Sequence, residues 1–197
     1  MLTSMTPIDE KLRCPWGSTD PLLRGYHDAE WGEPVHDDDQ LFEFLCLEGA
    51  QAGLSWRTVL AKREHYRRVF YDFNIPHVAA MKDAELEKLL LDPGIIRNRL
   101  KVFSTRDNAA VALDVIAEFG SLDGYLWSFV DGRTRVNGWR RSGDVPASTP
   151  LSDGMSKAMK KRGFRFVGTT IIYSLMQATG MVNDHIVGCF RHATVGQ

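Results

Sequence analysis

Two cysteines and two histidines near the ends of the chain have the residue types and spacing of a zinc site. Cys14 and His27 enclose twelve residues, and His185 and Cys189 lie four positions apart. On a helix, a spacing of four places imidazole and thiolate on one face, so that both can reach one ion. The four residues would form a closed tetrahedral Zn²⁺ site, which is structural because no coordination position stays open. The spacing equally allows buried thiols and ordinary histidines, and Cys46, which lacks a nearby partner, is expected to be a core residue.

One carboxylate, Glu48, falls on the apolar face of a predicted helix. It lies seven positions after Leu41, four after Phe44 and three after Leu45. A carboxylate in such a place is costly unless it is paired or hydrogen-bonded. Acids in clefts with shifted pKa values are frequent functional groups, so Glu48 is the candidate catalytic residue. The alternative is a structural glutamate that caps a neighbouring helix or pairs with an arginine.

Four aromatic residues accompany this carboxylate. Trp16, Tyr26 and Trp31 lie in a short stretch rich in glycine and proline, and Trp56 follows Glu48 by two helical turns. Aromatic rings in a loop-like stretch either cover the core or form a flat stacking pocket. The sequence leaves both possibilities open.

A basic segment, residues 157–169, lies between two predicted helices. A glycine-bearing hairpin between helices exposes backbone N–H groups that accept a phosphate oxygen, and neighbouring cationic side chains add charge. The alternative is a solvated charged helix end. The segment predicts contacts with backbone phosphates for Lys160, Lys161, Arg162, Gly163, Arg165, Gly168 and Thr169.

The elements that must position these residues are predicted to be helices, because apolar residues recur at helical spacing and period-two strands are absent. We expect one all-α globule, with a helix-hairpin-helix motif at about 152–179 and a zinc site that joins the two ends. Residues 1–12 are expected to be a disordered extension, 13–192 the helical domain and 193–197 a flexible tail. Helices are predicted for residues 38–54, 55–71, 83–92, 95–119, 122–130, 152–161, 169–179 and 183–190, and a long loop for 131–150.

Composition limits the classes of function. The 197 residues are 44% hydrophobic and 25% charged, typical of a folded globular domain. Twenty-four Lys and Arg residues against 25 Asp and Glu residues give a net charge of −1, which excludes DNA binding by bulk positive charge but not by a local basic surface. Three cysteines do not suit a disulfide-stapled secreted domain. The uncharged stretch 166–183 contains several polar and small residues, which favours a buried helix over a membrane span.

These motifs, in this order, resemble one family. RCPWGSTDP, GYHDAEWGEP, FEFLCLEGAQAGLSWRTVL, DPGIIRNRLKV, KKRGFRFVGTTIIYSLMQATG and VNDHIVGC extend from about Arg13 to Cys189. The sequence resembles the DNA-3-methyladenine glycosylase I family of the helix-hairpin-helix glycosylase superfamily. The resemblance implies a monofunctional hydrolase of base excision repair. Such an enzyme flips 3-methyladenine out of duplex DNA, hydrolyses its N-glycosidic bond and releases the free base. It also implies a monomer in the bacterial cytosol or nucleoid, without a membrane partner.

The resemblance also implies roles for individual residues. Glu48 accepts hydrogen bonds from the flipped base, Tyr26 and Trp56 sandwich it, and Trp16 and Trp31 lie close by. Structural Zn²⁺ is implied on Cys14, His27, His185 and Cys189. Family members often have a tyrosine where this chain has Leu23.

The second predicted hairpin helix, residues 169–179, has no Asp, although enzymes of the superfamily often have a catalytic acid there. Glu48 is therefore the strongest carboxylate candidate. Two rival functions stay open from the sequence: a non-catalytic DNA-binding module, and a redox or metal sensor that uses Cys14 and Cys189.

Overall fold

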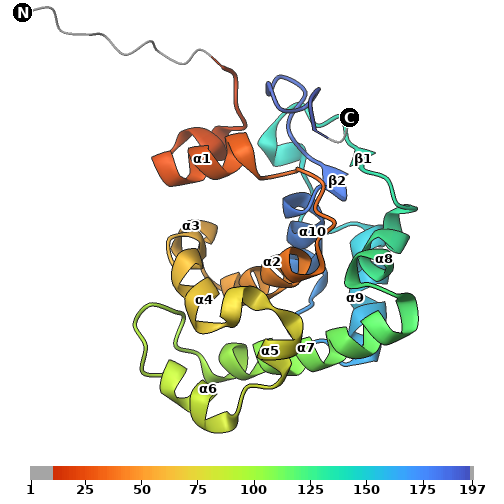
Figure 1. Ribbon diagram of the computed structural model, residues 1–197. Coiled ribbons are helices and arrows are strands. Elements are labelled where there is room, and N and C mark those ends of the chain that lie inside the picture. Colours follow the sequence, from red (N-terminus) through yellow and green to blue (C-terminus); the bar gives the residue numbers. More distant parts are fainter. Residues whose placement is uncertain (1–10, 196–197) are drawn as a thin grey trace, which may run out of the picture.

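The computed structural model describes residues 11–195, and it is mostly helical (Figure 1). The α-helices are α1 (Pro21–Ala29), α2 (Asp38–Gln51), α3 (Trp56–Leu60), α4 (Arg63–Val69), α5 (Ile75–Ala79), α6 (Asp83–Leu89), α7 (Arg99–Phe119), α8 (Leu122–Trp127), α9 (Pro150–Arg162) and α10 (Thr169–Ala178). Short 3₁₀ helices cover Pro15–Ser18, Tyr71–Phe73, Ser128–Val130 and Ser142–Asp144. The two strands, β1 (Arg135–Val136) and β2 (Val182–Asn183), form one parallel pair. No helix within residues 11–195 is long and apolar enough to cross a membrane.

Helix α2 runs through the centre of the molecule, and α3, α5, α7, α8 and α10 pack around it (Figure 1). Asp37 caps its N-terminus, because the carboxylate of this residue accepts a hydrogen bond from the backbone N–H of Gln40. All side chains from Leu41 to Ala50 are buried, because this helix is surrounded rather than lying on the surface. Glu48 is therefore carried into the interior by the most buried helix of the described fold.

Helices α9 and α10 are joined by a turn, residues 163–168, and pack against each other. Gly163, at φ +103°, ends α9 in the left-handed conformation that favours glycine. Phe164 and Val167 of the turn are buried. The Asn108 side chain of α7 accepts a hydrogen bond from the Arg165 N–H (2.8 Å) and donates one to the Arg165 carbonyl (3.0 Å). The turn is therefore fixed to the core.

Several predicted helix boundaries were wrong. Residues 20–30 were taken as loop-like, but they contain α1, which Asp20 caps and Pro21 starts. The helix predicted for 55–71 is divided into α3 and α4, and the helix predicted from residue 95 begins only at Arg99, because Asn98 caps it. The predicted helix 122–130 ends in a 3₁₀ turn from Ser128.

The helix predicted for residues 183–190 is absent. Asn183 instead belongs to β2, its side-chain oxygen accepts a hydrogen bond from the His185 N–H, and its amide donates to the His192 carbonyl. Such local side-chain bonds compete with helix formation. The prediction of an all-α fold was thus right for most of the structure, and the strand pair is the exception.

The predicted terminal segments lie partly outside the described residues, namely 1–10 and 196–197. The Leu12 carbonyl accepts a hydrogen bond from the Phe190 N–H (2.9 Å), and Val195 is buried. The domain boundaries at 12 and 193 stay predictions.

Candidate active site and metal centre

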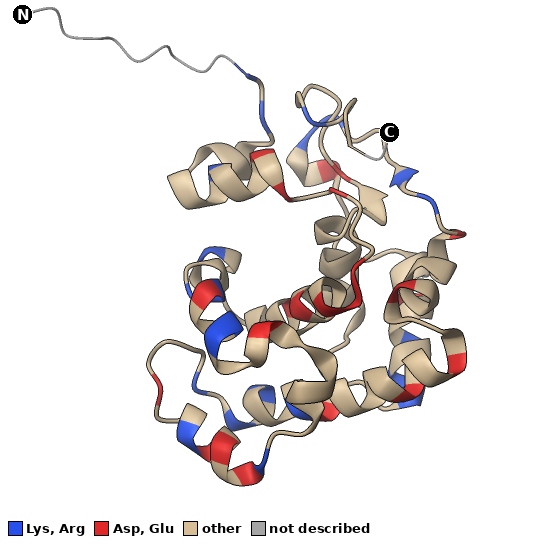
Figure 2. Ribbon diagram, viewed as in Figure 1, with Lys and Arg blue, Asp and Glu red and all other residues tan. Residues whose placement is uncertain are grey.

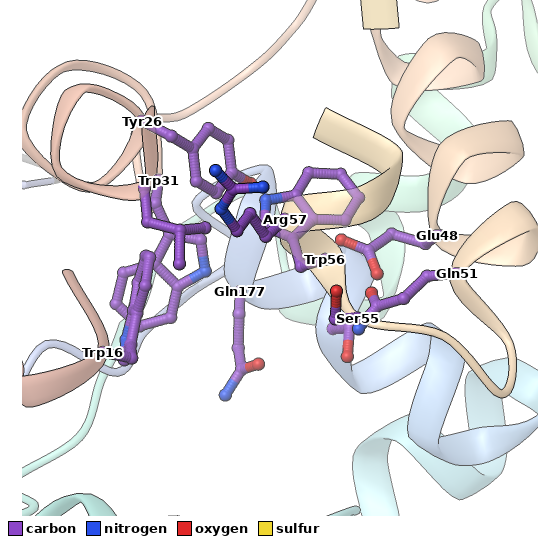
Figure 3. Close-up of a pocket in the computed structure, with 11 residues that line it drawn as sticks. Trp16, Tyr26, Trp31, Glu48, Gln51, Ser55, Trp56, Arg57 and Gln177 are labelled. Carbon is purple, nitrogen blue, oxygen red and sulfur yellow. The ribbon is translucent and has the colours of Figure 1, made fainter. Parts of the chain in front are cut away.

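A cavity of about 310 Å³ opens between α1, α2, α3 and α10 (Figure 3). Five predicted site residues line it: Trp16, Tyr26, Trp31, Glu48 and Trp56. The cavity wall also contains Leu23, Gln51, Ser55, Arg57, Ser174 and Gln177. Of these, only Leu23 was noted in the sequence. The structure thus brings together the carboxylate and the aromatic residues that the sequence singled out.

Glu48 is buried and has no hydrogen-bond or ion-pair partner among residues 11–195. Burial raises the pKa of its carboxyl from the ordinary 4.5 to about 8. Glu43, one turn earlier on α2, shows the opposite arrangement, because it accepts hydrogen bonds from Arg63 (2.6 Å) and Arg67 (2.9 Å). The structural role that the sequence left open for Glu48 belongs to Glu43 instead.

Two further polar groups at the cavity are buried without a partner. The Tyr26 hydroxyl and the Trp56 Nε1–H make no hydrogen bond within the described structure. Figure 3 shows both rings and the Glu48 side chain lying next to one another. Buried polar groups are nearly always hydrogen-bonded in folded proteins. A carboxyl, a hydroxyl and an indole N–H left unpaired in one cavity indicate a ligand with polar groups.

The two rings that the resemblance implies as a base sandwich are not arranged as a sandwich. The ring centroids of Tyr26 and Trp56 are 5.3 Å apart, with planes inclined by 48°. A base between them requires two stacking distances, about 7 Å in total. Trp16 and Trp31 meet edge to face at 5.0 Å. A ligand that stacks on both Tyr26 and Trp56 must separate them first.

The four predicted metal ligands converge on one point. The side chains of Cys14, His27, His185 and Cys189 are buried, and their ligand atoms all lie within 4.8 Å of one another. The Cys189 Sγ is 3.4 Å from His27 Nε2 and 3.5 Å from His185 Nδ1, and the Cys14 Sγ is 3.6 Å from His185 Nδ1. Tetrahedral Zn²⁺ with ordinary Zn–S and Zn–N bonds places sulfur and nitrogen about 3.5 Å apart. The donor set therefore fits such an ion.

The outer nitrogens of both histidines are also bound, as is typical of metal ligands. His27 Nδ1 lies 2.8 Å from Asp28 Oδ1, and His185 Nε2 lies 3.0 Å from the Trp31 carbonyl oxygen. The Arg13 guanidinium in turn donates to Asp28 (2.8 Å). These contacts aim the inner nitrogens at the sulfur atoms. The reasoning from a helix at 183–190 was wrong, but the set of four residues that it selected is brought together.

Comparisons with known proteins show to which family the chain belongs. A family model described as methyladenine glycosylase matches residues 16–192. DNA-3-methyladenine glycosylase 1 of Escherichia coli (strain K12) is 51% identical over 177 residues, covering 90% of this chain and 95% of that protein. The chain belongs to the methyladenine glycosylase family.

Two further relatives support the assignment to the methyladenine glycosylase family. The DNA-3-methyladenine glycosylase of Haemophilus influenzae is 42% identical over 90% of this chain and 96% of that protein. A crystal structure of a variant of 3-methyladenine DNA glycosylase I, in complex with 3-methyladenine, matches with a TM-score of 0.89. It is 32% identical and covers 94% of this chain and 99% of that chain.

The cationic side chains of the basic segment in this methyladenine glycosylase family member differ in whether they have an ion-pair partner. Lys160 and Lys161 are exposed and have no ion-pair partner within residues 11–195. Arg162 instead pairs with Glu118 (2.7 Å), which draws its guanidinium over the ring of Phe119. Two further residues of the segment also have a partner. The Arg165 guanidinium lies 3.5 Å from the Asp107 carboxylate, and the Thr169 hydroxyl donates a hydrogen bond to Asp153. Lys160 and Lys161, like the exposed Lys157 one turn earlier, therefore have no ion-pair partner within the described residues.

Proposed function

We propose that this protein is a DNA-3-methyladenine glycosylase, which flips the alkylated adenine out of duplex DNA and hydrolyses its N-glycosidic bond. The unpaired, buried Glu48 carboxyl carries the proposal, because it shares a cavity with the unpaired groups of Tyr26 and Trp56. Curated relatives have this name, and a related enzyme has a structure with 3-methyladenine bound. A DNA-binding module without catalysis would need none of these three groups.

The substrate supplies much of the reactivity itself. Methylation at N3 places positive charge on the purine, so the base leaves the sugar more readily than an unmodified base. Flipping costs a few kcal/mol, and less where a damaged base pairs poorly. The protein therefore has to select and hold the cationic base while water attacks the sugar carbon. The products are free 3-methyladenine and an abasic site.

Glu48 recognises the flipped base by hydrogen bonding and charge. In the free protein its pKa is about 8 because it is buried, so the carboxyl is largely protonated at neutral pH. A cationic base close to it favours the ionised form and lowers that pKa again. The carboxylate then accepts hydrogen bonds from the base and stabilises its positive charge. Neutral adenine does not stabilise the ionised form of Glu48, so the positive charge on the base distinguishes the damaged base from normal adenine.

Tyr26 and Trp56 complete the pocket. Once their rings separate, each presents an aromatic face to the base, and stacking together with cation–π attraction contributes about 1–3 kcal/mol per ring. The Tyr26 hydroxyl and Trp56 Nε1–H are then free to bond to the ligand. Trp16 and Trp31 close the side of the pocket toward the metal centre.

Helices α9 and α10 would act as a helix-hairpin-helix DNA-binding motif. Helix α10 follows Gly168 without a side-chain cap, whereas Thr149 caps α9. Uncapped N–H groups at a helix start are donors for a phosphate oxygen. Lys160 and Lys161 add positive charge at the end of α9. Such contacts hold the DNA backbone and read no sequence.

The metal centre would hold Zn²⁺ in a structural role. Two cysteines and two histidines complete the coordination of the ion, so it has no position for substrate. It would fix α1, which carries His27 next to Tyr26, to the C-terminal segment. The spacing of the four ligands and the hydrogen bonds at the outer nitrogens of His27 and His185 favour a metal site over a thiol sensor. We also propose that the protein acts as a monomer in the bacterial cytosol.

The test is release of 3-methyladenine from methylated duplex DNA by the wild type, Glu48→Gln and Glu64→Gln. Glu64 is an exposed control on α4. We expect the wild type and Glu64→Gln to release base, and Glu48→Gln to lose at least about 100-fold in kcat, the usual scale for removing a positioned charged group from a transition state. A wild-type protein that releases no base refutes the proposal.

A further inference from the structure

A second cluster of cations lies outside the α9–α10 segment. Four arginines occur in residues 133–141, within the connection 131–147 that we name the arginine loop. All four are exposed. Arg135 pairs with Asp131 (2.8 Å) and Arg141 with Asp144 (3.0 Å), whereas the side chains of Arg133 and Arg140 have no ion-pair partner within the described residues. Figure 2 shows Lys and Arg along the segment around β1. The function proposed above uses none of these arginines.

The arginine loop is held in place by one buried carboxylate, Asp184. Its Oδ1 accepts hydrogen bonds from Asn137 (2.6 Å) and Trp139 (2.8 Å), and its Oδ2 accepts from Tyr173 (2.6 Å) and Gln177 (2.7 Å). Two of these donors belong to the loop and two to α10. The pairing of β1 with β2 adds a further anchor. Arg140 and Arg141, which follow Trp139, therefore belong to a segment that is hydrogen-bonded to the core rather than to an unanchored loop.

The loop also forms one wall of a groove that continues the base pocket. A second cavity of about 310 Å³ lies between Trp16 and Trp31 on one side and residues 142–147 of the loop on the other. It shares Trp16, Trp31, Ser174 and Gln177 with the base pocket. Its floor is the face of α10 that begins near the proposed phosphate-binding end, at Thr170. Arg140 and Arg141 directly precede this wall in the chain.

We propose that the arginine loop is a second contact surface for duplex DNA, in which Arg140 and Arg141 bind backbone phosphates beside the flipped nucleotide. The inference rests on the proposed function. The net charge of −1 provides no general attraction for DNA, so affinity has to come from local cations. An exposed ion pair such as Arg141–Asp144 contributes at most about 1 kcal/mol, so Arg141 can exchange its carboxylate partner for a phosphate at little cost.

The test compares charge-removing and charge-keeping variants. Binding to a duplex that contains a stable abasic-site analogue is measured by fluorescence anisotropy over a range of salt concentrations. For Arg140→Gln/Arg141→Gln we expect weaker binding and a log K against log [salt] slope smaller by about 2, one per phosphate contact. Arg140→Lys/Arg141→Lys should keep the wild-type slope. The control, Lys82→Gln/Lys88→Gln, removes two exposed charges at α6, away from α1 and the base pocket (Figure 1), and should change neither quantity.

A second measurement separates the inference from the proposed function. Binding of free 3-methyladenine, followed by tryptophan fluorescence, should be equal in the wild type and in all three double variants, because it needs the pocket alone. A glutamine variant with unchanged salt slope overturns the role of the arginine loop. Equal losses in the glutamine and lysine variants also overturn it, since charge would then not be the cause. A wild type that neither binds nor cleaves damaged DNA refutes the proposed function instead.

Discussion

At the scale of single residues, the pocket is defined by buried polar side chains that have no hydrogen-bond partner within the described residues. The Glu48 carboxyl lies four positions from Phe44 on a buried helix, and the fold provides it with no cation. The sequence indicated this, because a carboxylate on an apolar stripe is conspicuous. The sequence did not lead us to select Ser174 and Gln177 as site residues, although they lie on the helix that faces α2 across the pocket. Polar residues on one face of an apolar helix were the available signal.

The raised pKa of Glu48 predicts a pH-dependent stability difference. The unfolded chain ionises this carboxyl near pH 4.5, whereas the folded protein keeps it protonated up to about pH 8. The unfolded state therefore binds fewer protons in this window, and the Glu48 contribution to stability falls as pH rises from 4.5 to 8, then stays constant. The Glu48→Gln variant does not undergo this loss of folding stability, which is on the order of a few kcal/mol.

The measurement is the melting temperature of Glu48→Gln and the wild type between pH 4.5 and 9. The melting temperature of the variant relative to the wild type should increase up to about pH 8 and then level off. A difference that is constant over the whole range would contradict the raised pKa.

At the scale of elements, the base pocket depends on how α1 is held against α3. Asp20 caps α1 and also accepts a hydrogen bond from Arg57 Nε (2.7 Å), and this bond holds the pKa of Asp20 below its usual range. At the other end of α1, Glu30 pairs with Arg63 of α4. The helix that carries Tyr26 is thus tied at both ends to the helices beside Trp56. The sequence concealed α1, because Pro21 and Gly25 suggested a loop, although Asp followed by Pro is a common helix start.

We expect the Asp20–Arg57 pair to favour the closed ring arrangement. Arg57→Gln and Asp20→Asn, of which the second keeps a capping side chain, should bind free 3-methyladenine about 2–5-fold more tightly, because an exposed pair contributes at most about 1 kcal/mol. Titration by tryptophan fluorescence checks this. Equal or weaker binding by both variants would show that the pair does not restrain the rings.

The basic segment between α9 and α10 leads to a prediction about DNA binding. Lys160→Ala/Lys161→Ala should weaken binding to duplex DNA and lower its salt dependence, while the ranking of damaged bases stays unchanged. Arg162→Ala, in contrast, removes the pair with Glu118 and should affect DNA binding less. Competition binding at several salt concentrations measures both. A changed base preference in the lysine variant would contradict a role limited to the backbone.

At the scale of the whole molecule, the metal centre joins segments that are far apart in the chain. Spacing selected Cys14, His27, His185 and Cys189, yet the last two lie in an irregular segment rather than on the expected helix. The path of this segment depends on Asn183, which binds the His192 carbonyl nine positions later, and on Asp184, which binds the arginine loop far away in the sequence. The local spacing of apolar residues contains no information about such hydrogen-bond partners. The helical class and the ligand set were therefore predictable, whereas the path between the ligands was not.

Removal of a metal ligand should affect folding more than chemistry. We expect Cys189→Ala to lower the melting temperature by several degrees or more, because a closed metal site contributes folding free energy. Cys46→Ala, at a buried thiol outside the centre, is the control for lost packing. Metal analysis after dialysis should find one zinc ion per wild-type chain and much less in Cys189→Ala. Unchanged melting together with lost turnover would contradict the structural role.

The junction between residues 14 and 189 also has a consequence for synthesis on the ribosome. Tyr26 and Trp31 are made early, but their segment is secured by contacts with His185 and Cys189, which are made more than 150 residues later. Contacts at such long sequence separation form late in folding. The nascent chain therefore carries an incomplete base pocket until residue 189 has left the ribosome, and a chain that stops before that point is unable to retain a damaged base.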